Sequence, residues 1–193
     1  MSDKDSPLES ITITDVLPVD WQQLSDMPSA GEQLRLQRAN EALLQNLLLS
    51  SNLPEEGEES EDAKAHEHFT RIEARLDLLV DLVTEMLTSN GTLPPARSVT
   101  IGAHGLAVHL EDDAADTFPG NALLLIRLYL DPQFPRPLQL YARLLVQQEQ
   151  GFTVRFSPLE PRLQDLLDKY IFRQHRRAIA LARQGENNSF TTI

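Results

Sequence analysis

Histidines are the first side chains of this sequence whose type could support catalysis or metal binding. His104 precedes Gly105, and an imidazole at such a turn could act as a general base or as a ligand. His66 and His68 are two residues apart, so on a helix they would point in different directions, and no third ligand accompanies them. We therefore expect His104 to be an ordinary turn residue, and we expect no metal site.

Acidic clusters and nucleophile motifs also fail to indicate an enzyme. Asp112, Asp113 and Asp116 lack the glycine and the final glutamate of a calcium-binding loop, which favours a surface connection between two strands. The sequence contains no GxSxG elbow, P-loop, dinucleotide fingerprint or zincin helix. It therefore predicts a protein that is not an enzyme and that carries no cofactor.

A basic cluster near the C-terminus offers different chemistry, because it could bind an anion or an acidic partner. It consists of Arg173, His175, Arg176 and Arg177. These residues lie in the second half of a segment with helical periodicity, where cations also complement the helix dipole. Both roles are open, and we favour a solvated face that balances the acidic N-terminal third of the chain.

The most regular pattern is the stretch FTRIEARLDLLVDLVTEML, residues 69–87. Its apolar residues recur at intervals of three and four, which is typical of the a and d positions of a coiled coil. These seam residues are Phe69, Ile72, Leu76, Leu79, Val83 and Met86. Because Val80, Leu82 and Leu87 widen the apolar stripe, a two-stranded coil would not cover it, and we expect more than one neighbouring helix.

A second amphipathic helix is predicted over residues 32–51, where Leu36, Leu43 and Leu47 share one face. Residues 52–63 are acidic and poor in apolar side chains, so we expect a flexible connection to a helix at residues 64–89. These helices could pack on their own domain or on other copies of the chain. The strict heptad period, which suits a long straight seam, favours self-association.

The elements after Pro95 change from helical to β periodicity. Alternating apolar residues predict strands in ARSVTI, GLAVHL, LLLIRLYL, LQLYARLLV and GFTVRF, all within residues 95–157. An earlier strand is predicted over residues 8–17, ended by Pro18. Short strands at this spacing favour an antiparallel sheet or a small barrel. With a C-terminal helix at residues 159–184 and a loose tail, the fold class is α+β.

The charge distribution limits the partners. The formal net charge is −12; residues 1–62 hold 14 acidic and 3 basic residues, whereas residues 63–193 hold 15 and 14. Nucleic acids and anionic membranes attract basic surfaces, so we expect neither as a partner. The absence of cysteine suits a reducing compartment. The polar N-terminus is unlike a signal peptide, and no apolar run reaches the about 18 residues of a membrane span. We therefore expect a cytoplasmic protein.

Several segments together resemble the atypical PilZ proteins of bacteria. They are DVLPVDW, the helical insertion, TLPPARSVTIGAHGLAV where the strands begin, and LLDKYIFRQHRR after them. The likeness is to the branch whose PilZ barrel carries heptad-repeat helices and assembles as a tetramer, and it covers residues 10–180. It implies a single domain over residues 1–193 with a six-stranded antiparallel β-barrel. It also implies a homotetramer with a role in cyclic di-GMP signalling, through a protein partner.

Typical PilZ domains bind cyclic di-GMP through an RxxxR motif followed by a D/N-x-S-x-x-G motif, because paired arginines grip phosphates and a small turn lets the backbone approach. On this chain the second motif falls on residues 100–105 and only Gly105 matches. Thr100 stands in place of the acidic or amide residue, and Gly102 in place of serine. No RxxxR precedes them, and Arg97 is the arginine nearby.

The sequence therefore leaves three functions open. The first is a signalling protein that works by self-assembly and protein contacts. The second is a cyclic di-GMP receptor with an altered pocket, with Arg97, Thr100, Gly102 and Gly105 near the ligand. The third is an adaptor that docks the helix of another protein.

Overall fold

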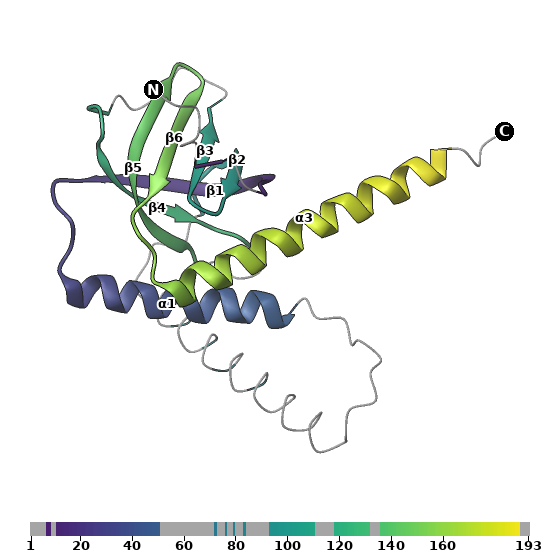
Figure 1. The fold of residues 1–193 in the computed structure, drawn as a ribbon, viewed down its shortest axis with the longest axis horizontal. Coiled ribbons are helices and arrows are strands. Elements are labelled where there is room, and N and C mark those ends of the chain that lie inside the picture. Colours follow the sequence, from purple (N-terminus) through teal and green to yellow (C-terminus); the bar gives the residue numbers. More distant parts are fainter. Residues whose placement is uncertain are drawn as a thin grey trace.

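The computed structural model describes residues 7–8, 11–50, 93–110, 118–131 and 136–189, and the single positions 72, 76, 79 and 83. Its elements are drawn in Figure 1. They are β1 (Ile13–Leu24), α1 (Ala30–Ser50), β2 (Ala96–Gly102), β3 (Gly105–His109), β4 (Leu123–Leu128), β5 (Leu138–Gln148), β6 (Gly151–Phe156) and α3 (Pro161–Ser189).

The six strands form a closed antiparallel barrel in the order β1-β2-β3-β6-β5-β4. Alternate residues of each strand face inward and fill the interior, as a small barrel requires. Val19, Val99, Leu106, Leu124 and Val154 are completely buried there. The predicted α+β class and six-stranded antiparallel barrel are confirmed, and the five segments predicted after Pro95 are β2 to β6.

The first strand is longer than predicted. β1 pairs with β2 as far as Pro18 and with β4 from Val19 onward. Proline has no N–H, and it is tolerated here because the strand changes partners at this point. The Pro18 carbonyl still accepts a hydrogen bond from the Tyr129 N–H at 3.0 Å. The prediction that Pro18 ends the strand was therefore wrong.

A second difference is a bulge in β5. The β5–β6 register shifts between Leu144 and Val146, so that one extra residue stands on β5. A bulge reverses the side on which the following side chains lie. Val146, which alternation predicts to face inward, is 50% exposed.

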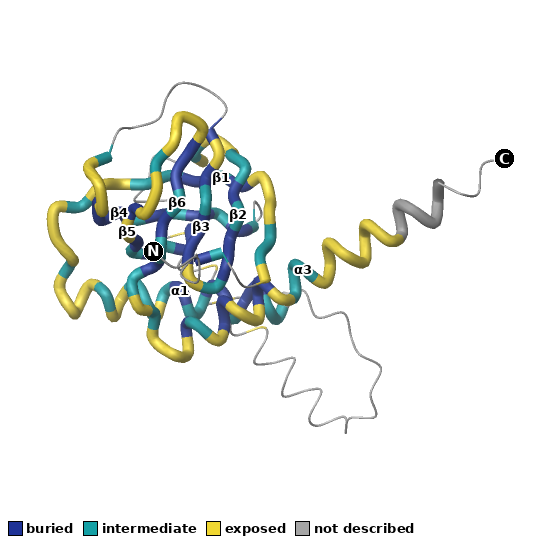
Figure 2. Tube along the Cα trace, turned by 45° about the horizontal axis from the view of Figure 1, so that its top comes forward, coloured by how far each residue is buried: buried dark blue, intermediate teal, exposed yellow. Residues whose placement is uncertain are grey.

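Helices α1 and α3 cross one another at one end of the barrel, and α3 projects beyond it (Figure 1). The buried residues of this junction are Leu43, Leu44, Leu47, Leu163, Leu166, Leu167, Tyr170 and Ile171. Burial raises the pKa of Tyr170 to about 12, so its phenol is neutral in this core. Figure 2 shows buried residues in the barrel and the junction, and exposed residues along α3 from residue 176 to residue 183.

The helix boundaries are close to prediction at α1 and differ at α3. α3 continues to Ser189, past the predicted end at residue 184. A glycine such as Gly185 costs a helix interior only about 1 kcal/mol relative to alanine, and no proline follows to stop the helix. Among the described residues, no helix is both long and apolar enough to cross a membrane.

Polar contacts cap the start of α1 and dock its middle on the barrel. At its start, the Ser29 N–H and hydroxyl donate to Glu32 Oε2 at 3.0 and 2.6 Å, which lowers the pKa of Glu32 and forms a capping box. Further along, Asn40 Nδ2 donates to the Gln139 carbonyl at 2.7 Å, and the Gln139 N–H donates to Asn40 Oδ1 at 3.0 Å. β6 pairs with β5 only from Ala142 onward, so Asn40 occupies the edge that β6 leaves open.

Candidate functional site

The β2–β3 turn carries the residues that the ligand motif indicates. Gly102 and Gly105 are register partners at the two ends of the turn, and Thr100 Oγ1 lies 2.9 Å from Thr14 Oγ1 on β1. The His104 carbonyl accepts a hydrogen bond from the Phe156 N–H at 2.8 Å, and Gln164 of α3 donates to the Ala103 carbonyl at 3.0 Å. The structure therefore brings Thr100, Gly102 and Gly105 together on a turn that is tied to β6 and α3.

The surface over these glycines is covered by the N-terminal segment of the chain. A Cβ placed on Gly102 would lie 2.9 Å from the Pro7 carbonyl oxygen and 3.2 Å from Leu8 Cδ2. A Cβ placed on Gly105 would overlap the carbonyl oxygen of Val154 and would lie 2.6 Å from Pro7 Cβ. Pro7 is buried in this position. The glycines thus form a cradle that holds Pro7 and Leu8.

Alanine at Gly105 is expected to destabilise the protein by about 1–3 kcal/mol, because the new methyl group meets the backbone of β6 as well as Pro7. Gly120→Ala is the matched control, since nothing lies within 4 Å of a Cβ at that position. Urea unfolding of both variants measures the difference. Equal stability of the two would show that the cradle is not tightly packed.

Arg97 lies away from this turn. It is five residues before Gly102 on the same strand, which corresponds to about 16 Å. Its guanidinium stacks 4.7 Å from the centroid of the Trp21 ring and donates to the Val19 carbonyl at 3.5 Å. Trp21 in turn meets Phe152 edge to face at 4.8 Å. The structure therefore does not group Arg97 with the glycines, and it gives Arg97 a packing role beside Trp21.

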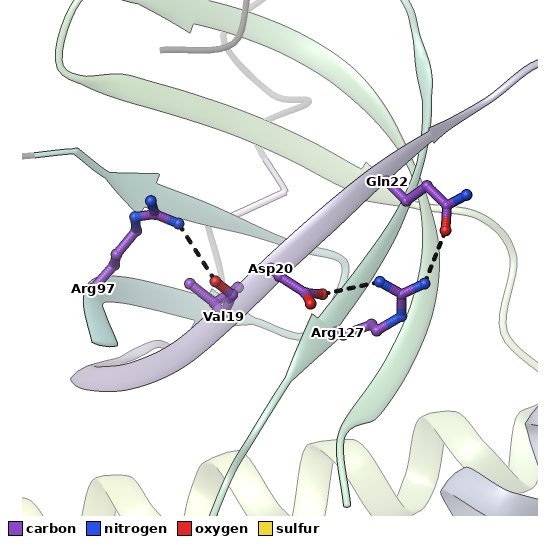
Figure 3. Close-up of polar contacts among 5 residues, drawn as sticks. All are labelled: Val19, Asp20, Gln22, Arg97 and Arg127. Atoms are coloured by element: carbon purple, nitrogen blue, oxygen red, sulfur yellow. Dashed lines mark hydrogen bonds and ion pairs between the residues drawn. The ribbon is translucent and has the colours of Figure 1, made fainter. Parts of the chain in front are cut away.

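Figure 3 shows the contact of Arg97 with Val19 and a second arginine on the neighbouring strand pair. Arg127 of β4 donates to Asp20 Oδ1 at 3.2 Å and to the side-chain oxygen of Gln22 at 2.8 Å, both on β1. These contacts cross-link β1 to β4 on the outside of the barrel. The guanidinium of Arg127 therefore finds hydrogen-bond acceptors within its own chain.

Sequence reasoning missed two arginines that lie beside the glycine turn. Gly105 of β3 is the register partner of Arg155 on β6, and Arg155 is the partner of Arg143 on β5. Arg143 is exposed, and its Nη1 donates to the Asn121 carbonyl at 3.4 Å. In the sequence, each of these arginines is a charged residue at an outward position of a segment with alternating apolar residues, and this is the signal that could have drawn attention to them. Their proximity depends on strand order, which the sequence pattern does not give.

The described seam residues are exposed. Ile72, Leu76, Leu79 and Val83 are helical, with exposed fractions of 43, 54, 55 and 54%. Phe69 and Met86 lie outside the described residues. The seam therefore offers apolar side chains at four described positions that this chain does not bury.

The predicted partner residues on α1 have a different environment. Leu43 and Leu47 are buried in the core that α1 shares with α3 and the barrel. Leu36 is half-buried and lines a groove of about 390 Å³ between α1, β5 and the start of α3. The structure thus separates these residues from the exposed seam positions.

The basic cluster on α3 makes contacts within the chain. Arg173 Nη1 donates to the Leu48 carbonyl of α1, and His175 Nδ1 lies 3.2 Å from the Thr12 carbonyl oxygen. Arg176 lies 5.9 Å from the centroid of the Phe172 ring. Arg173 and His175 therefore help to hold α3 against α1 and the start of β1.

Metal binding receives no support from the part of the chain that the structure describes. No group of three or more potential metal ligands occurs there. The pairs His66/His68 and Asp112/Asp113, with Asp116, lie outside the described residues. His104 is exposed at the turn.

Comparisons with known proteins agree with this geometry. A family model described as "atypical PilZ domain, cyclic di-GMP receptor" matches residues 47–184. The chain is also similar to the crystal structure of a pathogenic protein from Xanthomonas campestris, with a TM-score of 0.61, 24% identity, and coverage of 89% of this chain and 91% of that one. That protein is described as a tetrameric PilZ domain self-assembled via an unusual helical bundle. No curated protein matches the sequence.

Proposed function

Since the chain belongs to the atypical PilZ domain family, we propose that it is a non-enzymatic bacterial signalling protein that assembles with copies of itself through the heptad helix at residues 64–89. In this proposal it acts in the cytoplasm, in regulation linked to cyclic di-GMP, through a protein partner. The resemblance drawn from the sequence is confirmed by the family match.

The observation that carries self-assembly is the exposure of four helical residues of the seam, Ile72, Leu76, Leu79 and Val83. Apolar side chains at a and d positions gain free energy when another helix covers them, since burial contributes roughly 25 cal/mol for each Å² removed from water. The stripe is wider than a two-stranded coil covers, so the proposed assembly has more than two helices. The tetrameric organisation of the Xanthomonas protein supports a tetramer here.

The glycine turn supports a function that does not use the usual nucleotide motifs. Pro7 and Leu8 fill the surface over Gly102 and Gly105, and Arg97 is stacked on Trp21 at the other end of β2. A ligand at the turn would have to displace the N-terminal segment. Contact with protein partners therefore remains the preferred way for this protein to transmit a signal.

Mass determination by light scattering tests the assembly. We expect a mass close to four times that of the 21.7 kDa chain. A monomer at micromolar concentration would instead favour the adaptor, whose seam is free for the helix of another protein.

Calorimetric titration with cyclic di-GMP tests the alternative receptor function, which the family description favours. We expect no low-micromolar binding that depends on Arg97, because that side chain does not reach the turn. Binding that is lost in Arg97→Gln would contradict this expectation and favour the altered pocket.

A further inference from the structure

The groove between α1, β5 and the start of α3 leaves apolar side chains in contact with water. Its volume is about 390 Å³, which lies within the range of about 300–1,000 Å³ that is common for ligand pockets. Met27 and Leu34 are 42 and 46% exposed at this groove. Apolar side chains of its lining include Met27, Leu34, Leu36, Pro158, Leu159 and Leu163. The groove therefore offers apolar surface that a second molecule could cover.

Three polar side chains of the lining are free to bind such a molecule. They are the hydroxyls of Tyr141 and Ser157 and the carboxylate of Glu160. Within the part of the chain that the structure describes, none of these three groups has a hydrogen-bond or ion-pair partner. Gln37 differs from them, because its side chain already donates to Glu41 Oε1 at 2.8 Å. A mainly apolar groove with a few available polar groups is typical of a binding site.

The phenol of Tyr141 is placed to donate a hydrogen bond into the groove. Leu140 and Ala142, its neighbours on β5, are buried inside the barrel, so Tyr141 lies on the outer face of the strand. Burial, together with the nearby carboxylate of Glu32, raises the pKa of Tyr141. The phenol is therefore neutral near pH 7 and keeps its proton for donation.

The charges at the groove favour a cationic occupant. Glu160 is the charged side chain of the lining, and Glu32 lies near Tyr141. The hydrogen bonds from Ser29 lower the pKa of Glu32, which is therefore ionised near pH 7. Among the groups that act on Glu32, Arg35 has the smallest effect.

The charge of the whole chain points in the same direction. At a net charge of −12 the protein attracts cationic molecules and repels anionic ones. A second copy of the chain carries the same negative charge, so a different protein with a basic segment suits the groove better than a second copy does. Arg162, at the start of α3, does not reverse this preference, because it is paired with Glu41 at 3.5 Å.

We propose that this groove docks a short amphipathic segment of a partner protein, in which a lysine or arginine accompanies a bulky apolar side chain. The apolar side chain packs between Leu34 and Leu159, and the cation faces Glu160. The hydroxyls of Tyr141 and Ser157 donate to carbonyl groups of the segment. The inference rests on the protein partner of the proposed function, and it adds the chemistry of that partner and its place of contact.

The test measures binding of two fluorescent synthetic peptides to the full chain by anisotropy. Both peptides have the same leucines, and their remaining positions carry lysine in one and glutamate in the other. We expect the lysine peptide to bind at least about tenfold more tightly, and high salt to reduce this difference. Leu34→Lys should weaken the apparent Kd for the lysine peptide about tenfold or more, because a cation replaces an apolar contact. Glu160→Gln should weaken it about two- to fivefold, the range of an exposed ion pair.

Two matched controls separate the groove from the general charge of the protein. Leu145→Lys adds the same cation at a leucine of β5 that is 44% exposed and does not line the groove. Glu149→Gln removes an exposed carboxylate elsewhere. Both should bind the lysine peptide nearly as well as the wild type does. Unchanged thermal unfolding of all four variants checks that each one folds.

Several outcomes would overturn the proposal. The wild type could bind neither peptide, or it could bind both equally. Leu34→Lys could lose no more affinity than Leu145→Lys, or Glu160→Gln no more than Glu149→Gln, which would assign the attraction to net charge alone. A lower mass in solution for Leu34→Lys than for the wild type would make the groove a contact between copies of the chain. Because the mass of the wild type is read separately, failure of the groove leaves the self-assembly result intact.

Discussion

Aspartate at both Leu76 and Leu79 is expected to lower the mass in solution from that of an oligomer to the 21.7 kDa of one chain. These side chains are 54 and 55% exposed on the isolated chain, so the substitutions remove few contacts within it. In an assembly the same positions lie at the seam, where an unpaired carboxylate in an apolar core costs several kcal/mol. Each chain of the double variant would place two such carboxylates in the seam. Light scattering of wild type and variant measures the change.

The matched control is Ile179→Asp, which places the same charge at an exposed apolar position of another helix. Ile179 is 41% exposed in the second half of α3. We expect this variant to keep the mass of the wild type. Loss of assembly in Ile179→Asp, with Leu76 and Leu79 variants unaffected, would move the interface from the seam to α3. Unchanged thermal unfolding of the barrel in both variants would show that the fold is intact.

The strands of the barrel were predictable because alternation of apolar residues reports which face of a strand is buried. Prediction from this alternation fails where a strand changes its neighbouring strand or contains an extra residue. Pro18 removes one donor from a strand, yet β1 passes through it because the pairing moves from β2 to β4 there. Val146 reads as an inward residue, and the bulge after Leu144 turns it outward. Both exceptions depend on neighbouring strands that a local pattern does not contain.

The same limit applies to the apolar faces of the helices. Leu43 and Leu47 recur at the interval that places apolar residues on one face of a helix. The seam residues recur in the same way. The structure shows that α3 and the barrel cover the first pair, whereas Leu76 and Leu79 remain exposed. Periodicity indicates that a face needs a partner. It does not say whether the partner belongs to the same chain.

The candidate site was predictable only in part, because its residues come from distant segments. The motif located Thr100, Gly102 and Gly105 on one turn. The pairing of Arg155 with Arg143 follows from the strand order β3-β6-β5. The contact of Pro7 with Gly105 follows from the path of the chain before β1. In the sequence each arginine is a single polar residue within an apolar segment. Only the three-dimensional register makes them a pair.

Alanine at Asn40 is expected to lower the free energy of unfolding by about 2–4 kcal/mol, because the half-buried backbone N–H and carbonyl of Gln139 both lose their partner. Asn40 is 3% exposed, so water does not readily replace the amide. Its side chain continues the β-ladder where β6 stops, and it thereby docks α1 on the edge of β5. Urea unfolding followed by circular dichroism measures the loss.

Asn46→Ala is the matched control on the same helix. Asn46 is 6% exposed and its Nδ2 donates at 2.9 Å to the Ala42 carbonyl, four residues earlier, which is a bond within the helix. Alanine there leaves no strand group unsatisfied and is a better helix former, so we expect a change within about 1 kcal/mol. If the two variants lost equal stability, the cost would come from lost volume rather than from the open edge of β5. A selective loss in Asn40→Ala would show that a side-chain amide completes the barrel edge.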